Sequence, residues 1–324
     1  MQLAALEIMT ATPLMKAERI HGFGGPEVLR LEDVPRPNPG RNEVLVRVHA
    51  AGVNPVDWKI RRGQLGELRL PLVLGWDFSG VVEAIGKDVT EFAIGDEIFG
   101  EAAPGSGSYA EFALARTSQC AKKPAALDHI HAAALPVVGS TASQALFDIA
   151  DLRAGQTVLI HAAAGGVGSI AVQLAHLKGA RVIGTASSRN ADFVRQLGAD
   201  EVVDYRSAPF DESVRDVDVV LDTVGGDTQE RSWRVLKRGG ILVSTVQLIP
   251  KEKPVAFGVR GAHITQHPRS DQLAEIAELV ASKRITLNID TVLPLSEARR
   301  AQELSESRHA RGKIVLVVAS VYAA

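Results

Sequence analysis

The chain has 324 residues, of which 46% are hydrophobic and 23% charged, an ordinary balance for a globular protein and enough length for two domains. The net charge of −2 argues against a broad basic surface, so we expect no nucleic-acid partner. The single cysteine, Cys120, excludes an internal disulfide and a zinc site of several thiolates, and it agrees with a cytoplasmic location. No segment predicts a membrane span.

The first residues carry an apolar run with Glu7 inside it and no basic residue before it. A secretory signal needs a basic start and an uninterrupted apolar core, so this segment does not predict one. We expect residues 1 to about 14 to form a loose tail, and Met15 is a candidate natural start.

Short strand candidates fill residues 16–120. Clusters of β-branched residues, separated by Gly and Pro as in PRPNPG (35–40), predict a β-rich domain with turns between its strands. These strands are expected at 43–53, 78–86, 94–100 and 107–115.

The pattern changes near residue 125. The stretch 129–150 predicts a helix that Pro136 and Gly139 interrupt, and strands and helices alternate after it. Such alternation predicts right-handed crossovers and a parallel sheet, and the apolar runs VLI, VVL and ILV suit strands covered on both faces. Strands are expected at 157–161, 181–185, 201–203, 217–221 and 240–245, helices at 166–178, 190–197, 227–236 and 271–283, and a strand, a helix (296–307) and a strand (313–318) in the tail.

A glycine cluster, Ala163-x-Gly165-x-x-Gly168, lies between the first strand and the first helix of this series. Gly165 would let the backbone approach a pyrophosphate, and Gly168 would let the helix pack closely on the strand. The free N–H groups of the helix start, at Gly166, Val167 and Gly168, would then face the anion. The strand–helix–strand context favours a dinucleotide site over the alternative, a plain turn.

The end of the second strand distinguishes NAD from NADP. An NAD site places an acid about 20 residues on, where this chain has Ser187, Ser188 and Arg189 and no acid before Asp192. Two hydroxyls and a guanidinium suit a 2′-phosphate, so we expect NADPH. The alternative, which is compatible with this role, is that a serine caps the next helix and Arg189 is solvated.

At this point the chain resembles the medium-chain dehydrogenase/reductase family, and within it the zinc-free quinone oxidoreductase and enone reductase branch. The resemblance covers nearly all of residues 16–318. It rests on segments in a fixed order: KAERIHGFGGPEVLRLEDVPRP, AAGVNPVDWKIRRG, LPLVLGWDFSGVVEAIG, GSTASQAL, AAAGGVGSIAVQLA, LDTVGGDTQERSWRVLKRGGILVS and HARGKIVL.

The resemblance implies an α/β protein of two domains. A GroES-like, β-rich catalytic domain would be made from both chain ends, residues 1–138 and 286–324. A Rossmann domain with a doubly wound parallel sheet, residues 139–285, would be inserted between them and bind the cofactor. The family also implies a homodimer, and residues 259–266 could supply the exposed edge strand through which it forms.

A catalytic zinc is not expected. Zinc-dependent relatives place Cys where this chain has Asn54, and Gly-His-Glu where it has Gly75-Trp76-Asp77. Asn is a poor zinc ligand and indole is none. The pair His129 and His131 at a helix start predicts a solvated face. Without a Lewis acid, a quinone or an α,β-unsaturated carbonyl is an easier hydride acceptor than a simple ketone.

The family's cleft positions supply the catalytic candidates. Asn54 would donate its amide to the substrate oxygen or the nicotinamide ribose, with a turn before Pro55 as the alternative. Trp58 would form an aromatic wall for a planar acceptor, as would Trp76, for which core packing is the alternative. Thr141 resembles the threonine beside the nicotinamide.

Further positions resemble cofactor contacts. Tyr205 would lie near the adenosine ribose, Arg308 would reach the cofactor from the tail, and Val246 would meet the carboxamide. Asp57 is better explained as a helix cap, and Tyr109 is a candidate proton donor. The expected activity is NADPH-dependent reduction of a small quinone or enone; an enoyl-thioester reductase and an NADPH-binding protein with little turnover are the alternatives.

Overall fold

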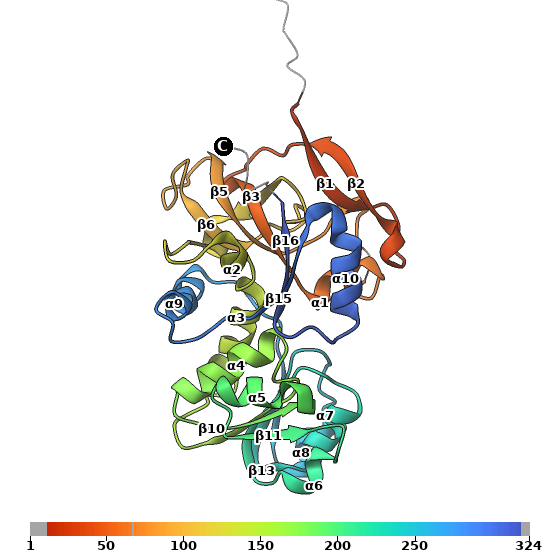
Figure 1. Ribbon diagram of the computed structural model, residues 1–324, viewed down its shortest axis with the longest axis vertical. Helices are drawn as coiled ribbons and strands as arrows, with labels where there is room; N and C mark the ends of the chain where they lie inside the picture. Colours follow the sequence, from red (N-terminus) through yellow and green to blue (C-terminus); the bar gives the residue numbers. More distant parts are fainter. Residues whose placement is uncertain (1–11, 67, 319–324) are drawn as a thin grey trace, which may run out of the picture.

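The computed structural model of the protein describes residues 12–66 and 68–318. Two parts lie one above the other along the long axis of the molecule (Figure 1). The upper part contains a three-stranded and a seven-stranded sheet, and the lower part contains a six-stranded sheet. This is the α/β fold class that the sequence predicts. Most of the predicted tail, residues 1–11, lies outside the described residues.

The seven-stranded sheet forms the body of the upper part. Its strand order is β15-β16-β3-β5-β6-β8, and β7 pairs with β3 off this path. β16 lies antiparallel to β3, with Leu316 opposite Ala51, so the tail returns to the first domain as the resemblance implies. The strands are β3 (Glu43–Val53), β5 (Asp77–Ile85), β6 (Glu97–Glu101), β7 (Phe112–Arg116), β8 (Cys120–Lys122), β15 (Ile289–Pro294) and β16 (Lys313–Val317).

A smaller sheet and two helices complete the upper part. The sheet contains β1 (Leu14–Ile20), β2 (Leu29–Pro35) and β4 (Leu72–Val73). Helix α1 (Pro55–Arg61) packs on α10 (Ala298–Glu306). Arg61 stabilises this contact, because its fully buried guanidinium donates hydrogen bonds to Gln302 and Glu306 of α10. The α1 segment therefore joins the two ends of the chain.

The six-stranded sheet is parallel throughout, as the strand–helix alternation predicts. Its strand order is β11-β10-β9-β12-β13-β14. From β9 the chain adds strands first on one side of the sheet and then, from β12, on the other side, while all strands stay parallel. Ligands of such doubly wound sheets bind at the carboxyl ends of the strands beside this change of side. The strands are β9 (Thr157–Ile160), β10 (Arg181–Ala186), β11 (Glu201–Asp204), β12 (Val217–Asp222), β13 (Leu236–Ser244) and β14 (Arg260–His263).

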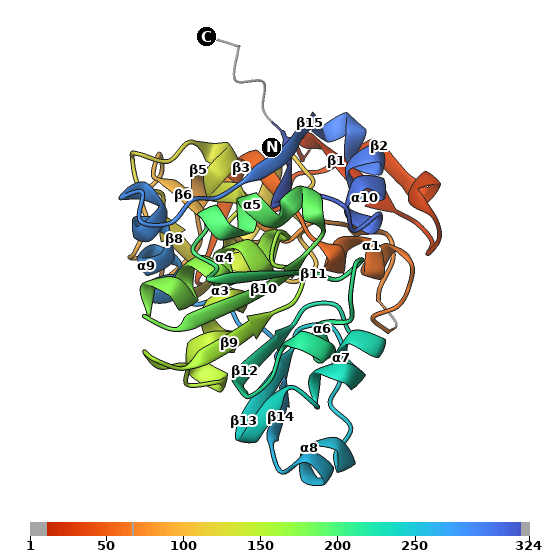
Figure 2. The ribbon, with the colours of Figure 1, turned by 60° about the horizontal axis from the view of Figure 1, so that its bottom comes forward.

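Helices cover both faces of this sheet (Figure 2). Val158 and Ile160 of β9 pack in one core cluster with α4, while Leu159 points to the other face and packs with α6 and Trp233. This alternation buries the strand on both sides, as its continuous apolar run predicts. The helices of the lower part are α4 (Gly166–Leu177), α5 (Ser188–Gln196), α6 (Phe210–Ser213), α7 (Asp227–Ser232), α8 (Glu252–Phe257) and α9 (Ser270–Ala281).

The junction of the two parts is helical. α2 (His129–Ala133) is followed by α3 (Pro136–Ser143) and a π-helical segment (Gln144–Ile149). Pro136 starts α3 rather than only breaking a helix. Gly139 does not interrupt α3, because its missing Cβ makes room for Ile276 of α9. The boundary expected at residues 138/139 falls inside α3 and stays a prediction, as does that at 285/286.

Three other expected elements differ from the structure. The strand expected at 107–115 begins only at Phe112, and the strand expected at 94–100 begins at Glu97 because Gly95 turns with a φ of 92°. The helix expected at 227–236 ends at Ser232. The chain forms a turn after Ser232, and Trp233 and Val235 in this turn are buried in the core on one face of the sheet.

Candidate active site

Asn54 lies where β3 ends and α1 begins, with 1% of its surface exposed. Its amide nitrogen donates to Oδ2 of Asp77 over 2.9 Å. Its amide oxygen accepts from the ammonium of Lys313, which also donates to the Val53 carbonyl at 3.0 Å and to Asp77 at 3.3 Å. We call Asn54, Asp77 and Lys313 the Lys313 junction.

The junction is closed to solvent, since Asp77 is fully buried and Lys313 is 3% exposed. Burial raises the pKa of Asp77, and the charge of Lys313 opposes this shift. The other oxygen of Asp77, Oδ1, accepts from the backbone N–H of Val137 at 3.0 Å. The junction therefore also holds the first turn of α3, the helix that carries Thr141.

Asp57 caps α1 as expected. Its Oδ2 accepts from the backbone N–H of Asn54 and from the hydroxyl of Tyr109, each over 2.8 Å. Burial raises the pKa of Asp57 to about 7, and it also raises the pKa of Tyr109 far above its usual value. Tyr109 is fully buried with its proton committed to Asp57, so the structure does not favour it as a proton donor.

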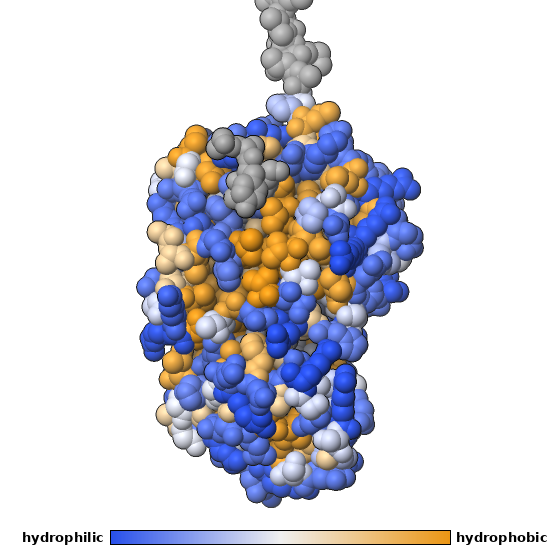
Figure 3. Space-filling view, viewed as in Figure 1, coloured by the Kyte–Doolittle hydropathy of each residue, from blue (hydrophilic) through white to orange (hydrophobic). Residues whose placement is uncertain are grey.

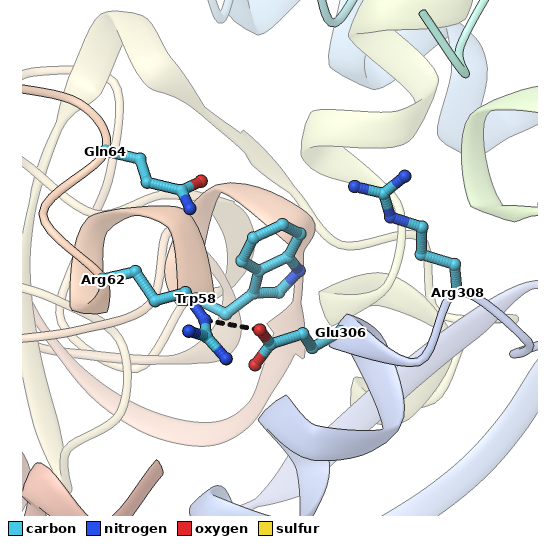
Figure 4. Close-up of a pocket in the computed structure, with 5 residues that line it drawn as sticks. All are labelled: Trp58, Arg62, Gln64, Glu306 and Arg308. Carbon is cyan, nitrogen blue, oxygen red and sulfur yellow. Dashed lines mark ion pairs between the residues drawn. The ribbon is translucent and has the colours of Figure 1, made fainter. Parts of the chain in front are cut away.

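An open pocket of about 510 Å³ lies beside Trp58. In Figure 4 the indole stands between Gln64 and Arg308, whose side chains extend toward it from opposite sides. Arg62 is paired with Glu306. The ammonium of Lys59 lies 5.8 Å from the centre of the indole, and the guanidinium of Arg308 extends toward the indole in Figure 4. The pocket combines a flat apolar wall with amide and guanidinium donors, as a planar acceptor requires. Trp76 is 38% exposed, so it is not a core residue.

The glycine turn joins β9 to α4. A Cβ on Gly165 would meet only the carbonyl of Ala162, at 3.3 Å, so its surroundings are otherwise open. A Cβ on Gly168 would meet Ala162 O at 2.3 Å and Ala163 Cα at 2.8 Å, so the helix packs directly on the turn. Gly166, Val167 and Gly168 form the first turn of α4, whose N–H groups have no partner within the helix, as in every first turn. Gly165 is the N-cap, and its own N–H donates to the Ala162 carbonyl over 2.9 Å.

The residues expected at the 2′-phosphate end β10. Ser187 is the N-cap residue of α5 and is 4% exposed, without a side-chain capping bond, while Ser188 and Arg189 are exposed. The guanidinium of Arg189 lies 3.4 Å from the carbonyl oxygen of His309, next to Arg308. Tyr205 is 52% exposed just beyond β11. The structure therefore brings Arg189 and the Arg308 segment together.

Two remaining candidates lie on the elements expected of them. Thr141 is in the second turn of α3 and is 7% exposed. Val246 follows β13, half-buried, and its N–H points to the hydroxyl of Ser244 at 3.4 Å. Both positions are compatible with the predicted contacts at the nicotinamide end.

The chemistry of these residues does not fit a zinc ion. Asn54 and Asp77 are already bonded to an ammonium, and Trp76 offers no lone pair. Within the described residues, no group of three or more His, Cys, Asp or Glu side chains is placed to hold a metal ion. His129 is not solvated as expected: its ring stacks on His49 at 4.3 Å and bonds to Ser79.

Comparison with known proteins agrees with this architecture. Residues 40–125 match the family model described as the alcohol dehydrogenase GroES-like domain, and residues 197–316 match the one described as zinc-binding dehydrogenase. The quinone oxidoreductase of Sus scrofa is 35% identical over 328 residues, covering 95% of this chain and 99% of that protein. The chain belongs to the medium-chain dehydrogenase/reductase family, in its quinone oxidoreductase branch. It is an oxidoreductase.

Two solved structures of this family differ in the cofactor that they name. A mycobacterial protein complexed with NADPH is 33% identical, with a TM-score of 0.85, and covers 94% of this chain and 100% of its own. A structure described as an NAD-dependent alcohol dehydrogenase is 32% identical, with a TM-score of 0.87 and the same coverage. Fold similarity alone therefore does not select the cofactor. No helix within the described ranges is long and apolar enough to cross a membrane.

The sequence interpretation missed the central cation of the site. Lys313 stands at the start of KIVLV, where its four neighbours in the strand are apolar. A lysine that opens such a buried strand has to find internal partners, because a buried unpaired charge is costly. A lysine at the start of an apolar strand was therefore the sequence feature that could have indicated this buried cation.

Proposed function

We propose that this oxidoreductase is an NADPH-dependent, metal-free reductase that transfers a hydride to a quinone or an α,β-unsaturated carbonyl. The observation that carries the cofactor proposal is the grouping of Arg189 with the Arg308 segment at the end of β10, where no acid is present. Two cations and two serines suit a 2′-phosphate, whereas an acid there would bind the 2′-hydroxyl of NAD.

The proposed cofactor fits the residues present. The first turn of α4 would hold the pyrophosphate, Ser188 and Arg189 the 2′-phosphate, and Tyr205 and Arg308 the adenosine side. Ser187 would contribute mainly as the N-cap of α5, because it is buried. Thr141, Val246 and the amide of Asn54 would position the nicotinamide end.

The protein's contribution to the reaction is orientation and charge stabilisation. NADPH, when bound, supplies the hydride. Trp58 would align a flat acceptor, and neutral or cationic donors would stabilise the oxygen that gains charge. A conjugated acceptor needs no Lewis acid, since its new charge spreads onto that oxygen. Asn54 and Asp77 contact an ammonium where zinc-dependent relatives have ligands, which supports the metal-free proposal.

Substitution of Arg189 tests the cofactor choice. Charge-assisted hydrogen bonds to the 2′-phosphate contribute roughly 1.5–3 kcal/mol each. Arg189→Ala is therefore expected to raise the KM for NADPH about 10- to 100-fold, at 1.4 kcal/mol per decade, and to leave the KM for NADH unchanged. Steady-state kinetics with both cofactors measures this difference.

Arg195→Ala is the matched control. Arg195 lies on the same helix, is exposed and pairs with Asp192, so its loss should change neither KM. Equal small losses for NADH and NADPH in Arg189→Ala would place the phosphate elsewhere, and Tyr205 and Arg308 would be tested next.

Chelation tests the metal-free proposal. Quinone reduction is expected to survive prolonged dialysis against a strong chelator, because Asn54, Trp76 and Asp77 do not form a zinc site. Elemental analysis of the purified protein is the direct measurement. Zinc bound at one ion per chain, with activity lost on its removal, would contradict the proposal.

The acceptor class needs its own assay. Turnover of a simple quinone or a free enone with NADPH supports the proposal. Activity confined to an enoyl thioester would instead support the thioester reductase, and cofactor binding without turnover of any acceptor would support a binding protein.

A further inference from the structure

Lys313 is a buried cation whose three protons all have acceptors: the Val53 carbonyl, Asn54 Oδ1 and Asp77 Oδ2. Lysine is rarely buried, and removing its charge from water is costly unless close partners compensate. The position is therefore a built polar site within an otherwise apolar region of β16, in which Ile314, Val315 and Leu316 are buried.

The ammonium fixes which way the Asn54 amide faces. An ammonium only donates hydrogen bonds, so the amide oxygen of Asn54 has to face Lys313. The amide nitrogen then faces Asp77, which accepts one of its two N–H groups. Among the described residues only Asp77 accepts from this amide, so its second N–H is left for a further acceptor.

The same lysine lies against the glycine turn. A Cβ on Gly166 would come 3.2 Å from Cδ of Lys313, so the lysine stem runs beside the first residue of α4. The preceding residue, Gly312, donates its N–H to the carbonyl of Ala164 at 2.9 Å. Gly312 thus contacts the glycine turn with its backbone, and Lys313, the next residue, contacts the Asn54 amide with its ammonium.

A third element is tied to the junction through Asp77. Its Oδ1 accepts from Val137 at the start of α3, and Thr141 follows four residues later, about one helical turn on. The Lys313 junction therefore links the glycine turn, Asn54 and the helix of Thr141, although these come from separate parts of the chain.

We propose that Lys313 is a positioning residue for hydride transfer: through Asp77 and the amide of Asn54, it holds Asn54 and Thr141 in register with the glycine turn. This inference rests on the proposed reductase function and extends it. Lys313 itself does not contact the substrate; it keeps the Asn54 amide in the donor orientation.

The test uses two variants of the full chain. Lys313→Met keeps the apolar stem but leaves Asp77 without its cation, which by itself lowers stability. The double variant Lys313→Met/Asp77→Asn removes both charges and keeps an acceptor for Val137, so it should fold. It no longer holds an ammonium against the Asn54 oxygen. Because Val137 keeps the oxygen of the new amide at position 77, its nitrogen faces Asn54, and the Asn54 amide is expected to turn its oxygen toward position 77.

The measurements are thermal unfolding, the Kd for NADPH and kcat with 9,10-phenanthrenequinone. We expect the double variant to unfold near the wild-type temperature and to bind NADPH within about threefold of wild type, with kcat lowered about 10- to 100-fold because the reacting groups lose alignment. Lys122→Met is the control: Lys122 is an exposed lysine paired with Asp96, and its loss should change none of the three.

Two outcomes would overturn the inference. A double variant with wild-type stability and wild-type kcat would make the junction a structural ion pair only. Unfolding of both variants would show that Lys313 serves the fold itself.

A failure of the proposed function gives a different result. If wild-type protein binds NADPH but reduces no quinone or enone, the acceptor proposal fails. The positioning role of the Lys313 junction is then tested by cofactor binding instead of by kcat. The fluorescence of the bound nicotinamide is then expected to shift to shorter wavelength in wild type and not in the double variant. An equal shift in both would overturn the inference.

Discussion

Glu101 shows how a single buried acid links the two parts of the molecule. It lies on β6 with 1% of its surface exposed, and its Oε1 accepts from Gln266, which follows β14, at 2.7 Å. Burial, together with the nearby Asp77, raises the pKa of Glu101 to about 8. The folded protein therefore keeps this carboxyl protonated at a pH where the unfolded chain has ionised it.

The sign of the resulting pH dependence follows from proton binding. Between pH 4.5 and about 8 the unfolded chain binds fewer protons at Glu101 than the folded protein, so stability from this group falls as pH rises. Glu101→Gln cannot ionise, and its stability relative to wild type is expected to rise across this window. Urea unfolding at pH 5 and pH 8 measures the difference.

Glu97→Gln, on the same strand, is the control. Hydrogen bonding to Lys123 lowers the pKa of Glu97 from 4.5, so its contribution to stability is complete above pH 4.5 and is lost only at lower pH. The stability difference between Glu97→Gln and wild type should therefore stay constant from pH 5 to pH 8. A parallel response of the two variants would mean that Glu101 is ionised in the folded protein.

Residues of the candidate site were predictable from the sequence where they belong to a short, continuous motif. The glycine turn and the absence of an acid near Arg189 needed only local sequence. Lys313 was not predictable in the same way, because its partners Asn54 and Asp77 are 259 and 236 residues away in the chain. The pKa of Glu101 also depends on tertiary burial, which its own neighbours in sequence do not reveal.

At the scale of elements, the two glycines of the turn before α4 have different roles: Gly168 allows close helix packing, and Gly165 is expected to leave space for the anion. Gly168→Ala would place a Cβ against backbone atoms of Ala162 and Ala163, so α4 must shift from the turn, at a cost of about 1–3 kcal/mol. A Cβ on Gly165 would have a single close neighbour, the Ala162 carbonyl at 3.3 Å, and φ is −80°, so Gly165→Ala should lower stability less than Gly168→Ala does. NADPH should nevertheless bind Gly165→Ala at least about tenfold more weakly, because the new methyl fills the anion site.

Thermal unfolding and NADPH titration of both variants distinguish these roles. Tight NADPH binding by Gly165→Ala would place the pyrophosphate away from this turn. A fully stable Gly168→Ala would show that α4 does not pack as closely as these contacts require.

Elements with a clear hydrophobic period were predicted within a few residues, as for β3, β12 and α4. The buried strands of the lower sheet have continuous apolar runs, which are typical of strands covered on both faces. Short elements were missed, because α6 and α8 have four and six residues and show no full period. The predicted helix break at Gly139 was wrong, because this glycine allows α3 to pack closely on α9 and does not interrupt the helix.

At the scale of the whole molecule, dimer formation through β14 stays a prediction with new structural support. β14 is the edge strand of the six-stranded sheet, and Leu248, Val255 and Phe257 in and before the adjoining α8 are exposed. Exposed apolar side chains beside an open strand edge favour pairing with a second copy. Light scattering at micromolar concentration is expected to give twice the monomer mass.

Val255→Asp should shift this equilibrium toward the monomer, because Val255 is 81% exposed and its change leaves the core intact. Ile94→Asp, in an exposed turn of the upper part, is the control. Figure 3 shows a second apolar band on the upper part, where β15 and β16 lie. A dimer that survives Val255→Asp but is broken by Val292→Asp on β15 would place the interface there; a monomeric wild type would contradict both.

The return of β16 to the first sheet also sets an order of assembly during translation. The ribosome delivers β3 and β5 early, yet the strand that lies between β15 and β3 is made only at Lys313–Val317. Every strand of the lower sheet is complete by His263, about 50 residues sooner. The lower sheet can therefore form while one edge of β3 is still without its neighbouring strand, so the upper part of the molecule is open to wrong strand pairing for longest.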